Sequence, residues 1–264
     1  MNPLTRFKAA PNIVTETKLN IFAPYEKKNI KVSENHVIFE NDEFKVSING
    51  YMLNQIHRDI LDIALYYGDS KLESQVDDSR PVRLFSLYDI QRHLNYKSKN
   101  QHLWLDRKFK EMKRTTINIQ SKTDESWIEF NIIDIASYSQ KQSKYALVIS
   151  ELYMNFFDTQ ISVNYKSYLP IILSLSAQTK AAVRYLLSHS NDFQIDLELL
   201  MEKIGIQKNS ISHFSFTKNK NKILDDEEKL KALNITFKKQ STDKRKQDYT
   251  VQYRMLSKIQ VFHP

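Results

Sequence analysis

The stretch LFSLYDI, residues 84–90, decides the fold because a similar stretch, QIDLELL, occurs at residues 194–200. In each stretch, two residues suited to a β-strand precede a side chain that can cap a helix, Ser86 in the first and Asp196 in the second. Apolar residues then recur at helical spacing. The two caps stand 110 residues apart, and this match predicts an internal repeat.

The segments around each stretch extend the repeat. A helix with one apolar face is predicted before each strand, and a second such helix is predicted after each capped helix. Two strands with alternating apolar residues then close each copy. For the first copy, the flanking elements are a helix at 51–67, a helix at 101–113, and strands at 115–120 and 126–133. For the second copy they are a helix at 177–188, a helix ending near 233, and strands at 235–239 and 249–255.

The order helix–strand–helix–helix–strand–strand is that of a winged helix-turn-helix. We therefore predict a fold of the α+β class with two tandem winged helix-turn-helix domains, related by a pseudo-repeat. A flexible N-terminal arm is expected at residues 1–34, the first domain at 35–143, where a β-hairpin at 35–49 comes first, and the second domain at 144–264. The alternative to a repeat is chance similarity between short helix–strand units.

The composition argues against most enzyme classes. The chain has no cysteine, which rules out disulfides, thiolate metal sites and cysteine nucleophiles. Its three glycines, Gly50, Gly68 and Gly205, are too dispersed for a phosphate-binding loop. None of the seven histidines forms a metal-binding pair such as HxH or HExxH. We expect a protein that is not an enzyme and needs no metal or cofactor.

The sequence also bears on location. Residues 1–11 contain no apolar segment of the kind found in signal peptides. The longest apolar stretch, at 168–175, is much shorter than the roughly 20 residues needed to cross a bilayer. The expected location is therefore the cytoplasm, with no contact with a membrane.

Positive charge gathers in two places. The chain has a net charge of +8. Residues 97–114 hold seven basic and two acidic side chains, a net charge of +5, and residues 208–258 hold thirteen basic and six acidic, a net charge of +7. The rest of the chain is therefore negative. In a helix-turn-helix, the second helix enters the major groove of DNA, and each window contains that helix. The pattern predicts binding of double-stranded DNA.

Within these windows we predict the DNA-binding residues from their side-chain types and their positions. In the first helix, Leu105, Phe109 and Met112 share one face and should point to the core. The polar side chains left over should face DNA, because Arg, Lys and Asn read base edges or hold phosphates. For the first domain the candidates are Lys99, Asn100, His102, Arg107, Lys110, Lys113 and Arg114. For the second domain they are Ser215, Thr217, Lys218, Lys220, Asn221 and Lys222, with Lys244, Arg245 and Lys246 on the predicted wing.

The acidic run at 225–228 should repel phosphate, so we expect the contacts of the second helix to lie before it. Because of this run, the sequence does not determine where the second helix begins and ends. For each basic segment, a solvated surface without a ligand is the alternative interpretation.

The chain resembles the iteron-binding replication initiators of plasmids, most closely those of the IncQ and IncP broad-host-range groups. The resemblance extends over roughly residues 37–237 and fades toward both ends. The segments on which it rests are HRDIL at 57–61, LDRKFKEM at 105–112 leading into INIQ at 117–120, YALVIS at 145–150 and LSAQTKAAVRYL at 175–186. The chain departs from the family in its few glycines and in its acidic run.

The resemblance implies a function. Such a protein binds direct repeats, called iterons, in double-stranded DNA at a plasmid origin, promotes opening of the origin, and recruits the host replication machinery. It also implies contact with a host helicase or initiator protein, a homodimer formed through the first domain, a role in plasmid copy control, and repression of the protein's own promoter.

Three other functions stay open. A winged-helix transcriptional repressor would use the same surfaces without initiating replication, and an isolated inverted repeat in the DNA near the gene would favour it. A nuclease or relaxase would need metal-dependent nicking of DNA, for which the sequence shows no histidine motif. A structural or partner-binding module would carry the basic residues only as a solvated face.

Overall fold

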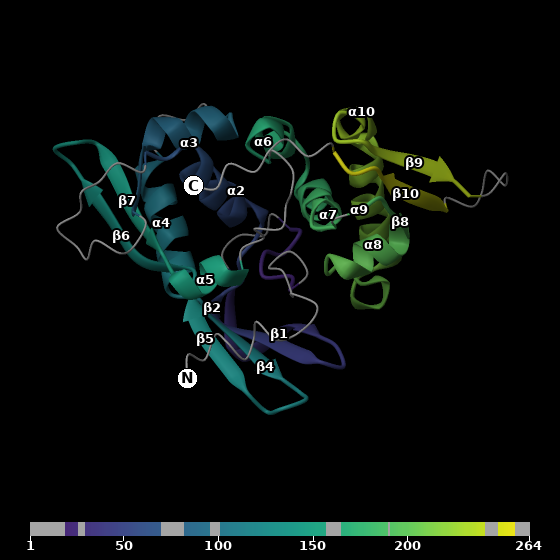
Figure 1. Cartoon of the computed structure of the whole chain (residues 1–264), viewed down its shortest axis with the longest axis horizontal. Coiled ribbons are helices and arrows are strands. Elements are labelled where there is room, and N and C mark those ends of the chain that lie inside the picture. The colour runs from purple at the N-terminus through teal and green to yellow at the C-terminus, as the bar shows by residue number, and fades with distance from the viewer. Residues whose placement is uncertain are drawn as a thin grey trace.

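The computed structural model describes residues 19–25, 30–69, 82–95, 101–156, 165–189, 191–240 and 248–256. These residues form a mixed α/β structure with three small antiparallel sheets (Figure 1). Apolar side chains from both halves of the chain join in one buried cluster. Within the described residues, no helix is long and apolar enough to cross a membrane. The same residues contain no group of three or more His, Asp or Glu that could hold a metal ion.

A four-stranded sheet occupies one end of the first half. Its strand order is β1-β2-β4-β5. The strands are β1 (Lys31–Glu40), β2 (Phe44–Tyr51), β4 (Thr116–Ser121) and β5 (Trp127–Asn131). Gly50 in β2 has a φ angle of +119°, and a Cβ there would collide with the carbonyl oxygen of Arg114. A glycine is therefore required where this sheet meets the end of helix α4.

The rest of the first half packs around a second sheet, with strand order β3-β7-β6. Its elements are α2 (Gln55–Tyr67), β3 (Val82–Ser86), α3 (Leu87–Leu94), α4 (His102–Lys113), β6 (Ile133–Ser139) and β7 (Lys144–Ile149). Helices α5 (Glu151–Phe156) and α6 (Tyr165–Leu173) follow before the second half.

The second half has the same succession of elements. They are α7 (Ala177–Leu187), β8 (Phe193–Asp196), α8 (Leu197–Lys203), α9 (His213–Asp225), β9 (Ile235–Lys239) and β10 (Tyr249–Tyr253). A 3-10 turn at Lys208–Ser210 precedes α9, and the short helix α10 (Glu227–Lys231) follows it. The sheet order is β8-β10-β9.

The two halves repeat one topology. The series α2-β3-α3-α4-β6-β7 corresponds to α7-β8-α8-α9-β9-β10, and the strand orders β3-β7-β6 and β8-β10-β9 are equivalent. The predicted caps are also present. The Ser86 side chain accepts a hydrogen bond from the backbone N–H of Asp89, and the Asp196 side chain accepts bonds from Glu198 and Leu199.

The structure corrects two of the sequence predictions for the first half. The strands that follow α4 were expected to close the repeat, but β4 and β5 join β2 in the separate four-stranded sheet. The equivalent of the hairpin β9–β10 is β6–β7, because β7 is the strand that pairs with β3. A domain boundary at 143/144 would therefore fall between two hydrogen-bonded strands.

Part of the predicted N-terminal arm has a defined structure. Leu19 and Ile21 are completely buried, and the backbone N–H of Ala23 donates to the carbonyl of Leu53. Strand β1 begins at Lys31, within the segment that was expected to be an arm. Burial of these apolar side chains against the core gives residues 19–25 a fixed place.

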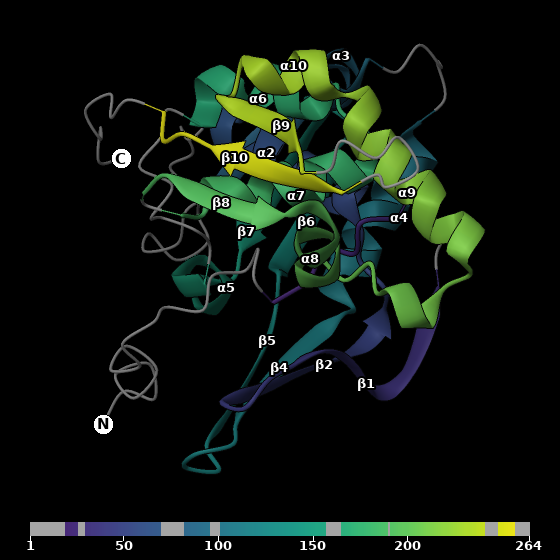
Figure 2. The same ribbon diagram turned by 90° about the vertical axis from the view of Figure 1, so that its right-hand side faces the viewer.

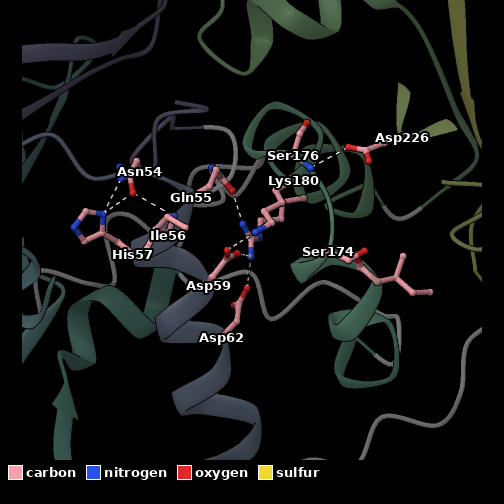
Figure 3. A network of polar contacts seen from close by, with 12 residues as sticks. Asn54, Gln55, Ile56, His57, Asp59, Asp62, Ser174, Ser176, Lys180 and Asp226 are labelled. Atoms are coloured by element: carbon pink, nitrogen blue, oxygen red, sulfur yellow. Dashed lines mark hydrogen bonds and ion pairs between the residues drawn. The ribbon is translucent and has the colours of Figure 1, made fainter. Parts of the chain in front are cut away.

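A buried ion network joins α2 of the first half to α7 of the second (Figure 3). The Arg184 guanidinium donates to Asp59 and to Asp62, each at 2.7 Å, and the Lys180 ammonium lies 2.5 Å from Asp59. Arg184 also donates to the side-chain oxygen of Gln55. Each charge in this network is buried and has a partner of opposite charge. The network therefore holds the two halves against each other.

Candidate nucleic-acid interface

Helix α4 has a buried face and an exposed face. Leu105, Phe109 and Met112 are at most 2% exposed and point into the core, as predicted. On the opposite side, a stripe of exposed side chains has the helical spacing i, i+4, i+7 and i+11. The members of this α4 stripe are Leu103, Arg107, Lys110 and Arg114. A shallow groove runs along it and is also lined by Tyr51, Asp106 and Glu111.

The buried side of α4 is held in place by a polar network. The Glu111 carboxylate lies 2.8 Å from both His57 Nε2 and the Lys108 ammonium. His57 Nδ1 lies 3.0 Å from the backbone nitrogen of Asn54 and 2.9 Å from the Asn54 side-chain oxygen, so the ring is held between Asn54 and Glu111. Burial lowers the pKa of His57 below its ordinary value, and the nearby Glu111 offsets only part of that effect. Lys108 is buried and paired with Glu111, so it is not part of the exposed stripe.

The start of α4 is held by an aromatic cluster. The Tyr145 hydroxyl donates to Asp106 at 2.8 Å and lies 3.2 Å from His102 Nδ1. Burial, followed by the Asp106 carboxylate, raises the pKa of the Tyr145 hydroxyl far above its ordinary value. The His102 ring also packs against Tyr138. His102 therefore has a structural contact in addition to its exposed surface.

Helix α9 presents an equivalent stripe. Phe216, Lys220 and Ile223 are buried, while the exposed side chains again follow the spacing i, i+4, i+7 and i+11. The members of this α9 stripe are Phe214, Lys218, Asn221 and Asp225. A shift of 111 residues superposes each member on its counterpart in α4, so that Leu103 corresponds to Phe214 and Arg107 corresponds to Lys218.

Lys220, one of the predicted DNA-binding residues, does not face solvent. Its side chain is 6% exposed and its ammonium lies 2.8 Å from Glu198 in α8. The hydrogen bond from Lys220 lowers the pKa of Glu198. Lys220 occupies the position that Phe109 has in α4, and the spacing of four residues from the buried Phe216 already places it inward.

The remaining candidates divide by exposure. Lys113 and Arg114 are exposed at the end of α4. Ser215, Thr217 and Lys222 are only half-buried, and Ser215 lies in the first turn, where its N–H is bound by the Ser212 cap. Five predicted residues lie outside the described part of the chain: Lys99, Asn100, Lys244, Arg245 and Lys246.

The acidic run has a structural role at the end of α9. The helix ends at Asp225, and Asp226 is buried, where it accepts a hydrogen bond from the backbone N–H of Ser176 at 2.9 Å. Burial alone would raise the pKa of Asp226, but the bonds from Ser176, Thr179 and Lys229 outweigh it, so the pKa is lowered. Asp226 thus ties α9 to the start of α7.

The two helices that carry the stripes lie toward the same side of the molecule. In Figure 1, α2 and α7 separate α4 from α9, and in Figure 2 both helices lie toward the right, with α9 in front. The basic members of each stripe could be predicted from the sequence, but the apolar members were not. Leu103 and Phe214 were missed because only polar side chains were considered for contact with DNA, although their spacing from Leu105 and Phe216 places them outside the core.

Comparisons with known proteins identify this fold. No protein-family model matches the sequence, and no curated protein sequence matches it. Among solved structures, domains 2 and 3 of RctB match with a TM-score of 0.56 and 12% identity, over 92% of this chain and 99% of that one. The Pi initiator protein in complex with iteron DNA matches with a TM-score of 0.50 and 17% identity, over 76% of this chain and 90% of that one. The chain has the fold that these proteins share.

Proposed function

We propose that this protein is a plasmid replication initiator that binds double-stranded iteron DNA at a replication origin. The observation that carries the proposal is the pair of equivalent stripes, one on each of two equivalent helices. In each stripe, a basic side chain, Arg107 or Lys218, stands exposed one turn after the helix begins. The likeness to the Pi initiator in complex with iteron DNA supports the same assignment.

In this proposal each half is a winged helix-turn-helix. Helices α3 and α4 form the helix pair of the first unit, and α8 and α9 form that of the second. The hairpins β6–β7 and β9–β10 are the wings. We place the boundary between the units after β7, within residues 150–176, because β7 is the central strand of the first unit's sheet.

Two linked units explain how a long DNA site is read. Once one unit is bound, the second is held at a high effective concentration near its own part of the site, so the whole chain binds more tightly than either unit alone. Direct repeats would then seat several copies of the protein side by side, and strain in the adjacent DNA would promote opening of the origin.

The further roles belong to the same proposal. The protein acts in the cytoplasm without catalytic activity of its own, and contacts a host helicase or initiator protein at the opened origin. It forms a homodimer through its first unit, and represses its own promoter when that promoter overlaps the repeats.

The test is a binding titration at two salt concentrations. With on the order of 6–10 phosphate contacts, affinity for duplex DNA should fall roughly 10³–10⁵-fold between 50 and 200 mM salt. Arg107→Ala should narrow the gap in affinity between a preferred duplex and a random one, because losing a base contact relaxes specificity. Lys122→Ala is the control, since Lys122 pairs with Glu40 in the four-stranded sheet. Affinity that is absent or insensitive to salt would rule the function out.

A further inference from the structure

The two most exposed of the large apolar side chains in the described part of the chain occupy equivalent positions. Leu103 is 80% exposed and Phe214 is 77% exposed. Each is the second residue of its helix, each follows a histidine, and each begins an exposed stripe whose next member is basic. Since the protein gains nothing by exposing a large apolar side chain to water, the repetition of this arrangement indicates a shared ligand.

The position of these side chains narrows the ligand. In a helix-turn-helix, the N-terminal residues of the second helix are the ones that contact base edges in the major groove. Arg107 and Lys218 lie one turn further along the same stripes, so Leu103 and Phe214 each have a basic neighbour on their own face of the helix. Asp225, the acidic member of the α9 stripe, lies at the far end of that helix. The stripes are therefore suited to a polyanion with apolar groups exposed on it.

Duplex DNA offers one such group in its major groove. Among the base edges, thymine presents its C5-methyl group, which apolar side chains contact, whereas the other edges present hydrogen-bonding groups. We propose that Leu103 and Phe214 are specificity-determining residues, each of which contacts a thymine methyl group in its own part of the DNA site. This inference rests on the proposed function and adds to it which bases the site must contain.

This inference can be tested by removing only the thymine methyl group from the DNA. Duplexes bound by the full chain are first selected from a random-sequence pool, and each thymine of a selected duplex is then replaced singly by deoxyuridine, which pairs identically and lacks only the methyl. Loss of one buried methyl group should weaken binding about fourfold. The wild-type protein should show this loss at one or more thymines in each of two separate segments of the duplex.

The variants assign each segment to a residue. Leu103→Ala should abolish the sensitivity to deoxyuridine in one segment, and Phe214→Ala should abolish it in the other. Trp127→Ala, which removes a side chain that is 65% exposed on β5, should retain both. Thermal melting of all three variants should match the wild-type protein, because these side chains make no contribution to the core.

Two results would overturn the inference. In the first, the wild-type protein binds every single-deoxyuridine duplex as tightly as its parent. In the second, both variants keep the wild-type pattern of sensitivity. In either case sequence-selective, salt-dependent binding would still stand, so the proposed function would survive. If no duplex is enriched from the pool, the proposed function and this inference fall together.

Discussion

Lys218 and Lys220 show how two residues of the same type, two positions apart, have different roles. Lys218 is exposed on the α9 stripe, whereas Lys220 is buried and paired with Glu198 at 2.8 Å. The same basic segment therefore contains one side chain suited to contact DNA and one that holds α9 against α8.

Alanine substitutions should separate these roles. Lys220→Ala should lower the free energy of unfolding by about 1–3 kcal/mol, because the partly buried Glu198 carboxylate would lose a charged hydrogen bond. Lys218→Ala should leave stability unchanged and weaken DNA binding, with a salt slope smaller by about one. Urea unfolding and salt titrations of both variants measure this. Equal loss of stability in the two variants would contradict the assignment.

Much of the exposed and buried pattern could be predicted at the residue scale. The inward face of α4 follows from the spacing of Leu105, Phe109 and Met112, and the structure confirms it. The burial of Lys220 was missed because its charge was given more weight than its place in the helical period. The partner that makes its burial tolerable, Glu198, lies in another helix, and sequence alone does not bring the two together.

At the scale of elements, the helices and caps were predicted more reliably than the pairing of the strands. Helix periods and caps depend on neighbours in sequence, so α2, α4 and α7 were found. Strand pairing depends on distant segments, and β5 continues almost directly into β6, with one residue between them. The strand predicted at 126–133 covers β5 and only the first residue of β6, so the insertion of β4 and β5 was not recognised and the boundary at 143/144 separated β6 from β7.

The joint between α2 and α4 makes stability depend on pH. Burial depresses the pKa of His57 in the folded protein, so folding is favoured while the ring is neutral. The contribution of His57 should be complete above its unfolded pKa of about 6.5, and should be lost as the pH falls from there through the folded pKa. Glu111, whose pKa is also lowered, titrates below this range.

Urea unfolding between pH 7.5 and 5 measures this dependence. The wild-type protein should lose stability across the range, and His57→Gln should lose less across the same range. His213→Gln is the control, because His213 is exposed at the start of α9 and lies outside the joint, so it should keep the wild-type pH dependence. An unchanged pH dependence in His57→Gln would show that this ring does not control it.

At the scale of the whole molecule, the α2–α7 network sets the distance between the two stripes. Asp59 and Asp62 are completely buried, and Arg184 donates to both. The repeat could be predicted from sequence, but this contact could not, because the partners lie more than 120 residues apart. A fixed spacing between the stripes would restrict the protein to DNA sites with one separation between their two parts.

Removing Arg184 tests that role. Arg184→Ala should lower the free energy of unfolding by about 3–5 kcal/mol, because two buried carboxylates would each lose a charged hydrogen bond, although Asp59 keeps Lys180 and Asp62 keeps Arg58. Lys208→Ala is the matched control, since its pair with Glu198 is exposed, and it should have little effect. Thermal or urea unfolding of both variants measures the difference in stability. A small effect of Arg184→Ala would mean that the two halves are not held together through this network.

A footprint of the full chain on the DNA that flanks its gene is the most direct test of iteron binding. We expect protected segments in 50 mM salt that share one sequence, point in one direction and recur at a constant interval, as direct repeats do. Each segment should show two protected stretches of major groove, one for each stripe. Protection of a single inverted repeat, or no protection in that salt concentration, would contradict the assignment as an iteron-binding initiator.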